Sequence, residues 1–453
     1  MNFGDSAVAL QRFRLGIYEL LDLSIPEADS RALPRRTRFY SSVYSGLPSR
    51  LLNMRIDRVA LVLALWSVPF GIALTESFFF IAFAARVTRL LRGRSRVEFP
   101  QVVWFWLLWA GLEIFAWCFS PDPRAGRGEM RHLFLLAVIF VTLPAMDELR
   151  HLATVWWGLF VTATVSSAFL VAKFLFRWMY YRHEISVAVD PSRYLRTGGL
   201  INHWMIYGTV EILVFAGLLA FWEVFPEKRR AWLPAYALNG LAIALSMTRM
   251  LWASCLLLLG IDLAWRRSKW LWAVPLLPLV FFVVAPGVLR TRLKESFSAD
   301  YYSNAERVQM LRVGWKMVKD RPLVGVGPGR VERLYRSYLS PAEPVPAYYG
   351  HLHNNVVELA AEFGLPVVAA ALLFVVVLWK ELNKRLKAAL DRDARFLCRS
   401  AILGLIGFLF AGLFDYTYGH SLALILTSFV VLTPLTTPSQ NGCVAAEDNI
   451  AAK

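Results

Sequence analysis

The chain is organised as a series of long apolar runs separated by short polar and basic segments. A helix needs about 20 mostly apolar residues to cross the hydrocarbon core of a membrane. By this rule the sequence predicts twelve spans, near 58–73, 74–90, 101–119, 132–146, 152–176, 200–224, 232–248, 250–265, 270–288, 356–379, 397–414 and 418–436. The expected fold is therefore all-α, a polytopic transmembrane helical bundle.

The short loops between the runs indicate which way the bundle is oriented, because loops rich in Lys and Arg stay in the cytoplasm. If the N-terminus is cytoplasmic, the inner loops carry 18 Lys and Arg and the outer short loops carry 8. We therefore expect both termini on the cytoplasmic side. The transmembrane part is expected over 58–288 and 356–436.

The two ends of the chain are polar by comparison. Residues 1–57 are Arg-rich and lack the apolar stretch and cleavage pattern of a signal peptide, so we expect a cytoplasmic segment that lies on the anionic inner leaflet or is disordered. Residues 437–453 are expected to be a cytoplasmic tail.

The longest connection, 289–355, falls between the ninth and tenth predicted spans and is expected on the outer side of the membrane. Ser303 followed by Glu306 is a capping-box pattern, which predicts the start of a helix. The apolar positions after it recur at helical spacing, at Val308, Leu311, Trp315 and Val318. We expect an amphipathic helix on the outer membrane face, ending at 320–322 and followed by a tight turn in the glycine-rich 325–329.

Composition supports the membrane interpretation and shows an excess of positive charge that needs an explanation. Hydrophobic residues make up 57% of the chain and charged residues 18%, against about 25% charged in soluble domains. The 49 Lys and Arg exceed the 33 Asp and Glu by 16. The basic residues punctuate apolar runs instead of forming a soluble basic domain, so nucleic-acid binding is not expected. Four cysteines exclude a disulfide scaffold, and no internal repeat is present.

Several basic side chains are expected at one level, the outer membrane face. Arg249 is the most informative of them, because an arginine placed near hydrocarbon costs about 2.5–3.5 kcal/mol on insertion scales. The alternative is an arginine that extends to the lipid headgroups. Arg196 precedes the sixth span, and Arg307 and Arg312 lie on the external helix. Because guanidinium groups bind phosphate in a bidentate manner, these residues favour a diphosphate ligand.

Two histidines lie where the long loop re-enters the membrane. His353 precedes Asn354 and Asn355, and an imidazole can take a proton from an attacking hydroxyl. We therefore predict His353 as a general base, with His351 as its nearest competitor. No metal site is expected, because no DxD motif and no His/Cys set with ligand spacing occurs in the sequence.

Several motifs of the second half of the chain are similar to those of a known family. The stretches 304–307 and 320–329, the triplet His353-Asn354-Asn355 and the stretch 362–366 resemble the O-antigen ligase and O-antigen polymerase superfamily. Thr248-Arg249 resembles the Thr-Ser-Arg hairpin of that family without its serine. Arg196-Thr197-Gly198-Gly199 resembles an earlier Arg-x-x-Gly element.

The resemblance implies an inverting, metal-independent and cofactor-free glycosyltransferase in the bacterial inner membrane, with its active site facing the periplasm. The implied donor is a glycan on undecaprenyl diphosphate, and the implied acceptor in the ligase branch is a sugar hydroxyl of lipid A–core. By the same resemblance, His353 is the general base, Arg196 and Arg249 bind the diphosphate, Arg307 supports the pocket and Asn354 orients the histidine or the acceptor. We include His351 and Arg312 among the expected substrate-binding residues.

Three alternatives remain open from the sequence. A polymerase would use two lipid-linked glycans, and a protein O-oligosaccharyltransferase would deliver the glycan to Ser or Thr. A lipid-linked glycan transporter belongs to a different class, but transporters tend to show internal repeats and substrate sites near the membrane midplane.

Overall fold

The computed structural model describes residues 55–94, 99–146, 149–182, 190–298, 301–346 and 349–436, and the regular elements within them are all helical. This confirms the all-α prediction. The predicted N-terminal segment, apart from its last three residues, and the predicted C-terminal tail lie outside the described residues.

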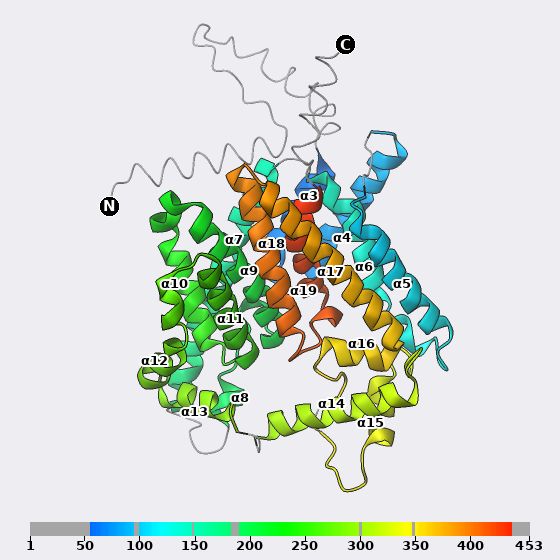
Figure 1. The fold of residues 1–453 in the computed structure, drawn as a ribbon. Coiled ribbons are helices and arrows are strands. Elements are labelled where there is room, and N and C mark those ends of the chain that lie inside the picture. The colour runs from blue at the N-terminus through cyan, green and yellow to red at the C-terminus, as the bar shows by residue number, and fades with distance from the viewer. Residues whose placement is uncertain are drawn as a thin grey trace, which may run out of the picture.

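Long helices running side by side form the body of the molecule (Figure 1). In chain order they are α3 (Ile56–Ser67), α4 (Ile72–Leu91), α5 (Val102–Cys118), α6 (Arg131–Thr142), α7 (Leu149–Tyr180), α9 (Trp204–Val224), α10 (Arg229–Leu245), α11 (Arg249–Trp265), α12 (Leu276–Val284), α17 (Leu365–Ala388), α18 (Arg392–Ala411) and α19 (Ser421–Thr436). Each of the twelve apolar runs thus contains at least one helix.

Five segments are long and apolar enough to cross a membrane by length and composition alone. They are Ala125–Ala145, His151–Tyr180, Trp204–Val224, Leu365–Ala388 and Arg392–Ala411. Val102–Cys118 and Ser421–Thr436 are shorter apolar helices. A multi-pass membrane protein follows from these helices, whereas the count of twelve spans stays a prediction.

Two predicted spans do not form single helices. The ninth, 270–288, divides into a 3₁₀ helix η6 (Lys269–Ala273) and α12, and Pro286 then precedes α13 (Gly287–Glu295). The tenth, 356–379, is interrupted at Gly364, which has a φ of 88° and separates α16 (Asn355–Phe363) from α17. A Cβ on Gly364 would collide with the carbonyl oxygen of Leu323, so the long loop packs directly against this break.

Helix α9 lies at the centre of the bundle. Most of its side chains are buried, and α18 packs against α9, α11, α17 and α19. Arg399 of α18 forms ion pairs with Glu223 of α9 and with Asp262 of α11, the latter at 2.9 Å. By contrast, α17 leaves Leu372 and other large apolar side chains exposed, as a lipid-facing helix does.

The long loop is built of α13, α14 (Tyr302–Asp320) and α15 (Val331–Tyr338), and α14 runs across one end of the bundle (Figure 1). The predicted end of the helix at Asp320 is confirmed. The predicted glycine turn is also confirmed, because Gly325, Gly327 and Gly329 all have positive φ.

Two details of α14 differ from the prediction. The helix begins at Tyr302, so Ser303 lies inside it instead of capping it, and the Ser303 hydroxyl accepts a hydrogen bond from Arg249. The predicted apolar stripe is also mostly exposed, as Trp315 shows at 54%. Val318 is the buried member of the stripe, and the buried face is formed by it together with Met310, Val313, Gly314 and Met317. Helix α14 therefore has one apolar face packed on the protein and a second facing outward.

Candidate active site

Arg196 lies in the segment that joins the short helix α8 (Pro191–Tyr194) to α9. Its guanidinium lies over the ring of Trp204, with 5.3 Å between the carbon Cζ and the ring centroid. Its Nε and Nη2 atoms are buried without a hydrogen-bond partner among the described residues. Burial and the nearby charge of Arg292 lower the pKa of Arg196 to about 10. A buried guanidinium with unsatisfied donors is a site that favours an anion.

Arg249 is the first residue of α11 and lies at the apolar hairpin predicted from the sequence. Its Nη1 donates a hydrogen bond to the backbone oxygen of Glu295 at 3.2 Å, and its Nη2 donates to Ser303 Oγ at 3.3 Å. Cζ lies 5.3 Å from the ring centroid of Tyr301. The partners are neutral groups of α13 and α14, so they orient the guanidinium without neutralising its charge.

Arg292 of α13 is a third arginine of this region, and its position in the sequence did not mark it as a candidate. Its side chain is only 3% exposed. Its Nε donates to the backbone oxygen of Met247 at 3.2 Å, and its Nη1 donates to Glu295 at 2.8 Å and to the Tyr301 hydroxyl at 2.9 Å. It therefore ties α13 to the hairpin that carries Arg249.

Arg307 of α14 completes this arginine cluster, which we define as Arg196, Arg249, Arg292 and Arg307. Burial lowers the pKa of Arg307, and the charges of Asp415 and Arg292 act on it in opposite directions. Burial likewise lowers the pKa of Arg249 to about 10, with further lowering by Arg292 and Arg307. The four guanidiniums repel one another, and a multiply charged anion would relieve that repulsion.

Arg312, which we expected to bind substrate, is not brought into the arginine cluster. It is exposed on α14, and its charge acts on Glu343, an acidic residue of the segment after α15. A helical turn and a half separates it from Arg307, which is enough to turn it to another face of α14.

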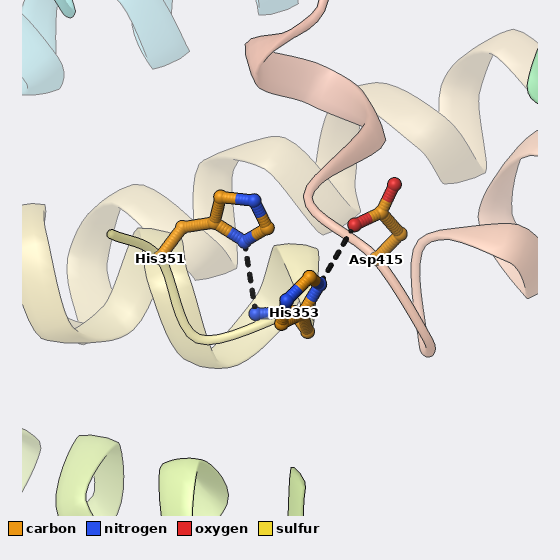
Figure 2. A group of neighbouring side chains, drawn as sticks. All are labelled: His351, His353 and Asp415. Carbon is orange, nitrogen blue, oxygen red and sulfur yellow. Dashed lines mark hydrogen bonds and ion pairs between the residues drawn. The ribbon is translucent and has the colours of Figure 1, made fainter. Parts of the chain in front are cut away.

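His353 lies in the loop that leads into α16, with a φ of 51°. A positive φ is uncommon for a residue other than glycine and clusters at functional sites. The backbone N–H of His353 donates a hydrogen bond to Nδ1 of His351 at 3.2 Å (Figure 2). The two rings lie 4.2 Å apart between centroids. His351 thus contacts the very residue whose backbone is strained.

Asn354 and Glu358 hold the same loop from its other side. The Asn354 side-chain oxygen caps α16 by accepting the N–H groups of Val356 and Val357, and its amide donates to the backbone oxygen of Leu413. The Glu358 carboxyl accepts the N–H of Leu352, which lies between the two histidines. Residues 351–353, which carry both histidines, are called the histidine loop below. Asn354 is placed to orient this loop through its backbone.

Asp415 is the partner of His353, and no motif in the sequence pointed to it. Nδ1 of His353 donates to Oδ1 of Asp415 at 2.9 Å (Figure 2). Nε2 of His420 lies 3.6 Å from Oδ2 of the same carboxylate. Burial acts to raise the pKa of Asp415, but the contacts with His353 and His420 outweigh it, so the net direction is down. The carboxylate is thus ionised and acts as an acceptor.

Asn355, the first residue of α16, also fastens the loop that carries Asp415. The backbone N–H of Asn355 donates to the oxygen of Gly412 at 2.7 Å, its side-chain amide donates to Thr417 at 2.9 Å, and its side-chain oxygen accepts the N–H of Tyr418. Asp415 lies within the loop closed by these bonds. The triplet His353-Asn354-Asn355 therefore supplies a catalytic candidate and both of its anchors.

The arginine cluster and the histidine loop belong to one region. The Asp415 charge acts on Arg307. The ring of His203 stacks on Trp204, the residue beneath Arg196, and lies 6.1 Å from the ring of His420. A substrate whose diphosphate contacts the arginines would thus place its other atoms toward the His353–Asp415 pair.

These contacts define the chemistry available at the site. Because an ionised carboxylate only accepts, Asp415 requires a proton on Nδ1 of His353, so in the neutral ring Nε2 is the basic nitrogen. Burial and the nearby His353 lower the pKa of His351 to about 3, so His351 stays neutral near pH 7. Of the two histidines, His353 has the carboxylate that stabilises an imidazolium.

The residues described also include one group with the donors of a metal site. His351, His353 and Asp415 each offer one ligand atom, and these atoms lie within 4.8 Å of one another. Ligand spacing in the sequence could not reveal it, since Asp415 follows His353 by 62 residues.

Residues 234–372 match the family model described as O-antigen ligase, a segment that includes Arg249, Arg292, Arg307 and His353. No curated protein matches the chain. The family model supports a ligase- or polymerase-type enzyme that handles lipid-linked glycans. Over residues 234–372 the chain is therefore similar to the O-antigen ligase family, and this match supports the resemblance found in the sequence.

Proposed function

We propose that this protein is an inverting, metal-independent glycosyltransferase. It transfers an O-antigen glycan from undecaprenyl diphosphate to a sugar hydroxyl of lipid A–core on the periplasmic face of the inner membrane. One observation carries the proposal: one buried and three half-buried arginines lie in the same region as a histidine that is hydrogen-bonded to an ionised carboxylate. The arrangement suits a diphosphate leaving group on one side and a hydroxyl nucleophile on the other.

Proton transfer begins at His353. Nε2 accepts the proton of the acceptor hydroxyl as its oxygen attacks the anomeric carbon of the donor sugar. Asp415 holds the Nδ1 proton at 2.9 Å and stabilises the imidazolium that forms. The proton then leaves His353 to solvent, which restores the base.

The leaving group is stabilised by charge. As the new carbon–oxygen bond forms, the bond between the anomeric carbon and the diphosphate oxygen breaks, and negative charge grows on the diphosphate. Arg196 and Arg249 receive this charge, and Arg292 and Arg307 support them. Because arginines neutralise the leaving group, the diphosphate departs without a proton donor or a metal ion. A single displacement of this kind inverts the anomeric centre.

The decisive experiment uses the purified protein and tests two acceptors. It is incubated with an undecaprenyl-diphosphate glycan and either lipid A–core or a second molecule of donor, and the products are separated. Extension of lipid A–core supports the ligase assignment, and extension of the second donor would assign the polymerase reaction instead.

A His353→Ala variant tests the mechanism in the same assay. We expect transfer to fall by roughly 10²–10⁴-fold, the usual contribution of a general base, with donor binding retained. Transfer at the unmodified rate would remove His353 from the mechanism. Transport of the donor without any transfer would favour the transporter class.

A further inference from the structure

We infer that His351, His353 and Asp415 bind one divalent transition-metal ion, for which Zn²⁺ is the probe, and that the bound ion inhibits the enzyme. Figure 2 shows the three side chains converging from two segments, the histidine loop and the loop after α18. Two imidazole nitrogens and one carboxylate oxygen are the ligand types found in three-ligand zinc sites, whose fourth position is taken by water.

The spacing of the ligand atoms fits this assignment after a small adjustment. Zinc-to-ligand distances are about 2.0–2.2 Å, so two ligands of a tetrahedral ion lie about 3.4 Å apart. The three atoms here lie within 4.8 Å of one another. The remaining difference is of the size that side-chain rotations supply. Both histidines lie in a loop, where such rotations do not disturb a helix.

His420 lies next to Asp415 and is a candidate second-layer partner of the proposed metal site. Its Nε2 is buried, has no hydrogen-bond partner among the described residues, and lies 3.6 Å from Oδ2 of Asp415. A small side-chain rotation would bring the two atoms within hydrogen-bond distance, and that bond would orient a ligating carboxylate. Partners of this outer kind change metal affinity by about 10–100-fold.

The donor set also determines which ions are excluded. Mg²⁺ and Ca²⁺ require mostly oxygen ligands, and this group supplies a single carboxylate. Imidazole favours Zn²⁺, Ni²⁺ and Cu²⁺. We therefore expect selectivity for transition metals over the alkaline-earth ions.

Inhibition follows from the identity of the ligands, and this step rests on the proposed function. A metal ion on His353 and Asp415 occupies the base and the carboxylate that orients it. Transfer should then be blocked by Zn²⁺ and restored by a chelator, whereas Mg²⁺ should have no effect.

The binding test uses the full chain in detergent, purified with an affinity tag that contains no histidine. Zn²⁺ is titrated by calorimetry, and Co²⁺ by its visible absorption. We expect one ion per chain in the unmodified protein. In His351→Asn and Asp415→Asn, affinity should fall by at least roughly 10–100-fold. His203→Gln, which changes a neighbouring histidine outside the group, should bind like the unmodified protein.

Thermal melting of each variant shows whether the variant is folded. If it is, the loss of metal binding is caused by the loss of the metal-ligating side chain. Stoichiometric binding that all variants retain, or its absence in the unmodified protein, would overturn the site. Binding without any effect on transfer would overturn the inhibitory role. Calorimetry needs no substrate, so a His353→Ala variant with full transfer activity would overturn the proposed function and leave the metal result standing.

Discussion

Asp415 and His353 form a hydrogen-bonded pair across 62 residues of sequence, with Oδ1 of the carboxylate 2.9 Å from Nδ1 of the ring. The pair joins the loop after α18 to the loop before α16. It gives His353 a defined tautomer and an adjacent negative charge, which a histidine at a helix start does not possess by itself. The catalytic candidate is therefore a dyad assembled by the fold.

Asp415→Asn tests the dyad. Asn retains the shape but removes the charge that stabilises the imidazolium, and its amide can present a donor to Nδ1, which favours the wrong tautomer. We expect kcat for glycan transfer to fall by roughly 10²–10⁴-fold with donor binding little changed. Asp415→Glu keeps the charge and serves as the control, with partial activity. Equal rates for Asp415→Asn and the unmodified protein would show that the carboxylate has no part in the reaction.

Arg249→Lys tests the diphosphate site. Lys retains the charge, but it loses the planar fork that now reaches both Glu295 and Ser303. We expect kcat to drop roughly 10²-fold, the scale for loss of one donor to a developing anion. Arg333→Lys is the matched control, because Arg333 is 68% exposed in a surface ion pair with Asp122. A wild-type rate in Arg249→Lys would contradict the assignment.

The sequence marked Arg249 as a candidate for a physical reason. A charged side chain in an apolar setting is costly, so Arg249 between apolar neighbours already required an explanation. Arg292 carried no such signal, because it lies in a basic segment of a long loop and becomes buried only when α13 packs against the hairpin. Asp415 follows an apolar run that ends near it, and its role depends on Asn355 fastening that loop.

Helix boundaries were harder to predict where tertiary contacts decide them. Ser303 has the capping pattern, but its hydroxyl is taken by Arg249, and the helix starts at Tyr302. The break at Gly364 was predictable in principle, since Pro366 in the first turn of α17 is a typical helix start after a glycine. The break was missed because the apolar run is continuous across it, and hydropathy alone does not show where one helix ends and the next begins in a new direction.

The orientation of the bundle can be tested with single cysteines in a background free of the four native ones. Ser337→Cys places a thiol on an exposed position of α15, and Ala388→Cys places one at the end of α17. We expect a membrane-impermeant maleimide to label the Ser337→Cys variant in intact spheroplasts and the Ala388→Cys variant only after permeabilisation. Labelling of both from the same side would contradict the predicted topology.

Gly325→Ala tests the contact between the glycine turn and α16. Gly325 has a φ of 65°, and a Cβ there would collide with the carbonyl carbon of Glu362. Strained backbone alone costs about 1–3 kcal/mol, and the contact adds to it. We expect a clear fall in melting temperature and in transfer, because α16 also carries the histidine loop. Gly287→Ala has no atom within 4 Å of the new Cβ and an ordinary φ, so its melting temperature should stay near that of the unmodified protein.

His351→Asn tests whether a buried neutral histidine makes the protein sensitive to acid. Burial lowers the pKa of His351 to about 3, whereas an unfolded histidine titrates near 6.5. Between these values the unfolded chain binds the extra proton, so the stability that His351 contributes is complete above about pH 6.5 and is lost as the pH falls toward 3.

Asn does not titrate, and its oxygen can accept the backbone N–H of His353 in place of Nδ1. Melting temperatures measured at about pH 7.5 and about pH 4.5 should therefore differ less in His351→Asn than in the unmodified protein. His351→Ala, which cannot accept that bond, should be less stable at both. An equal acid-induced decrease in the Asn variant and the unmodified protein would assign the sensitivity to other groups.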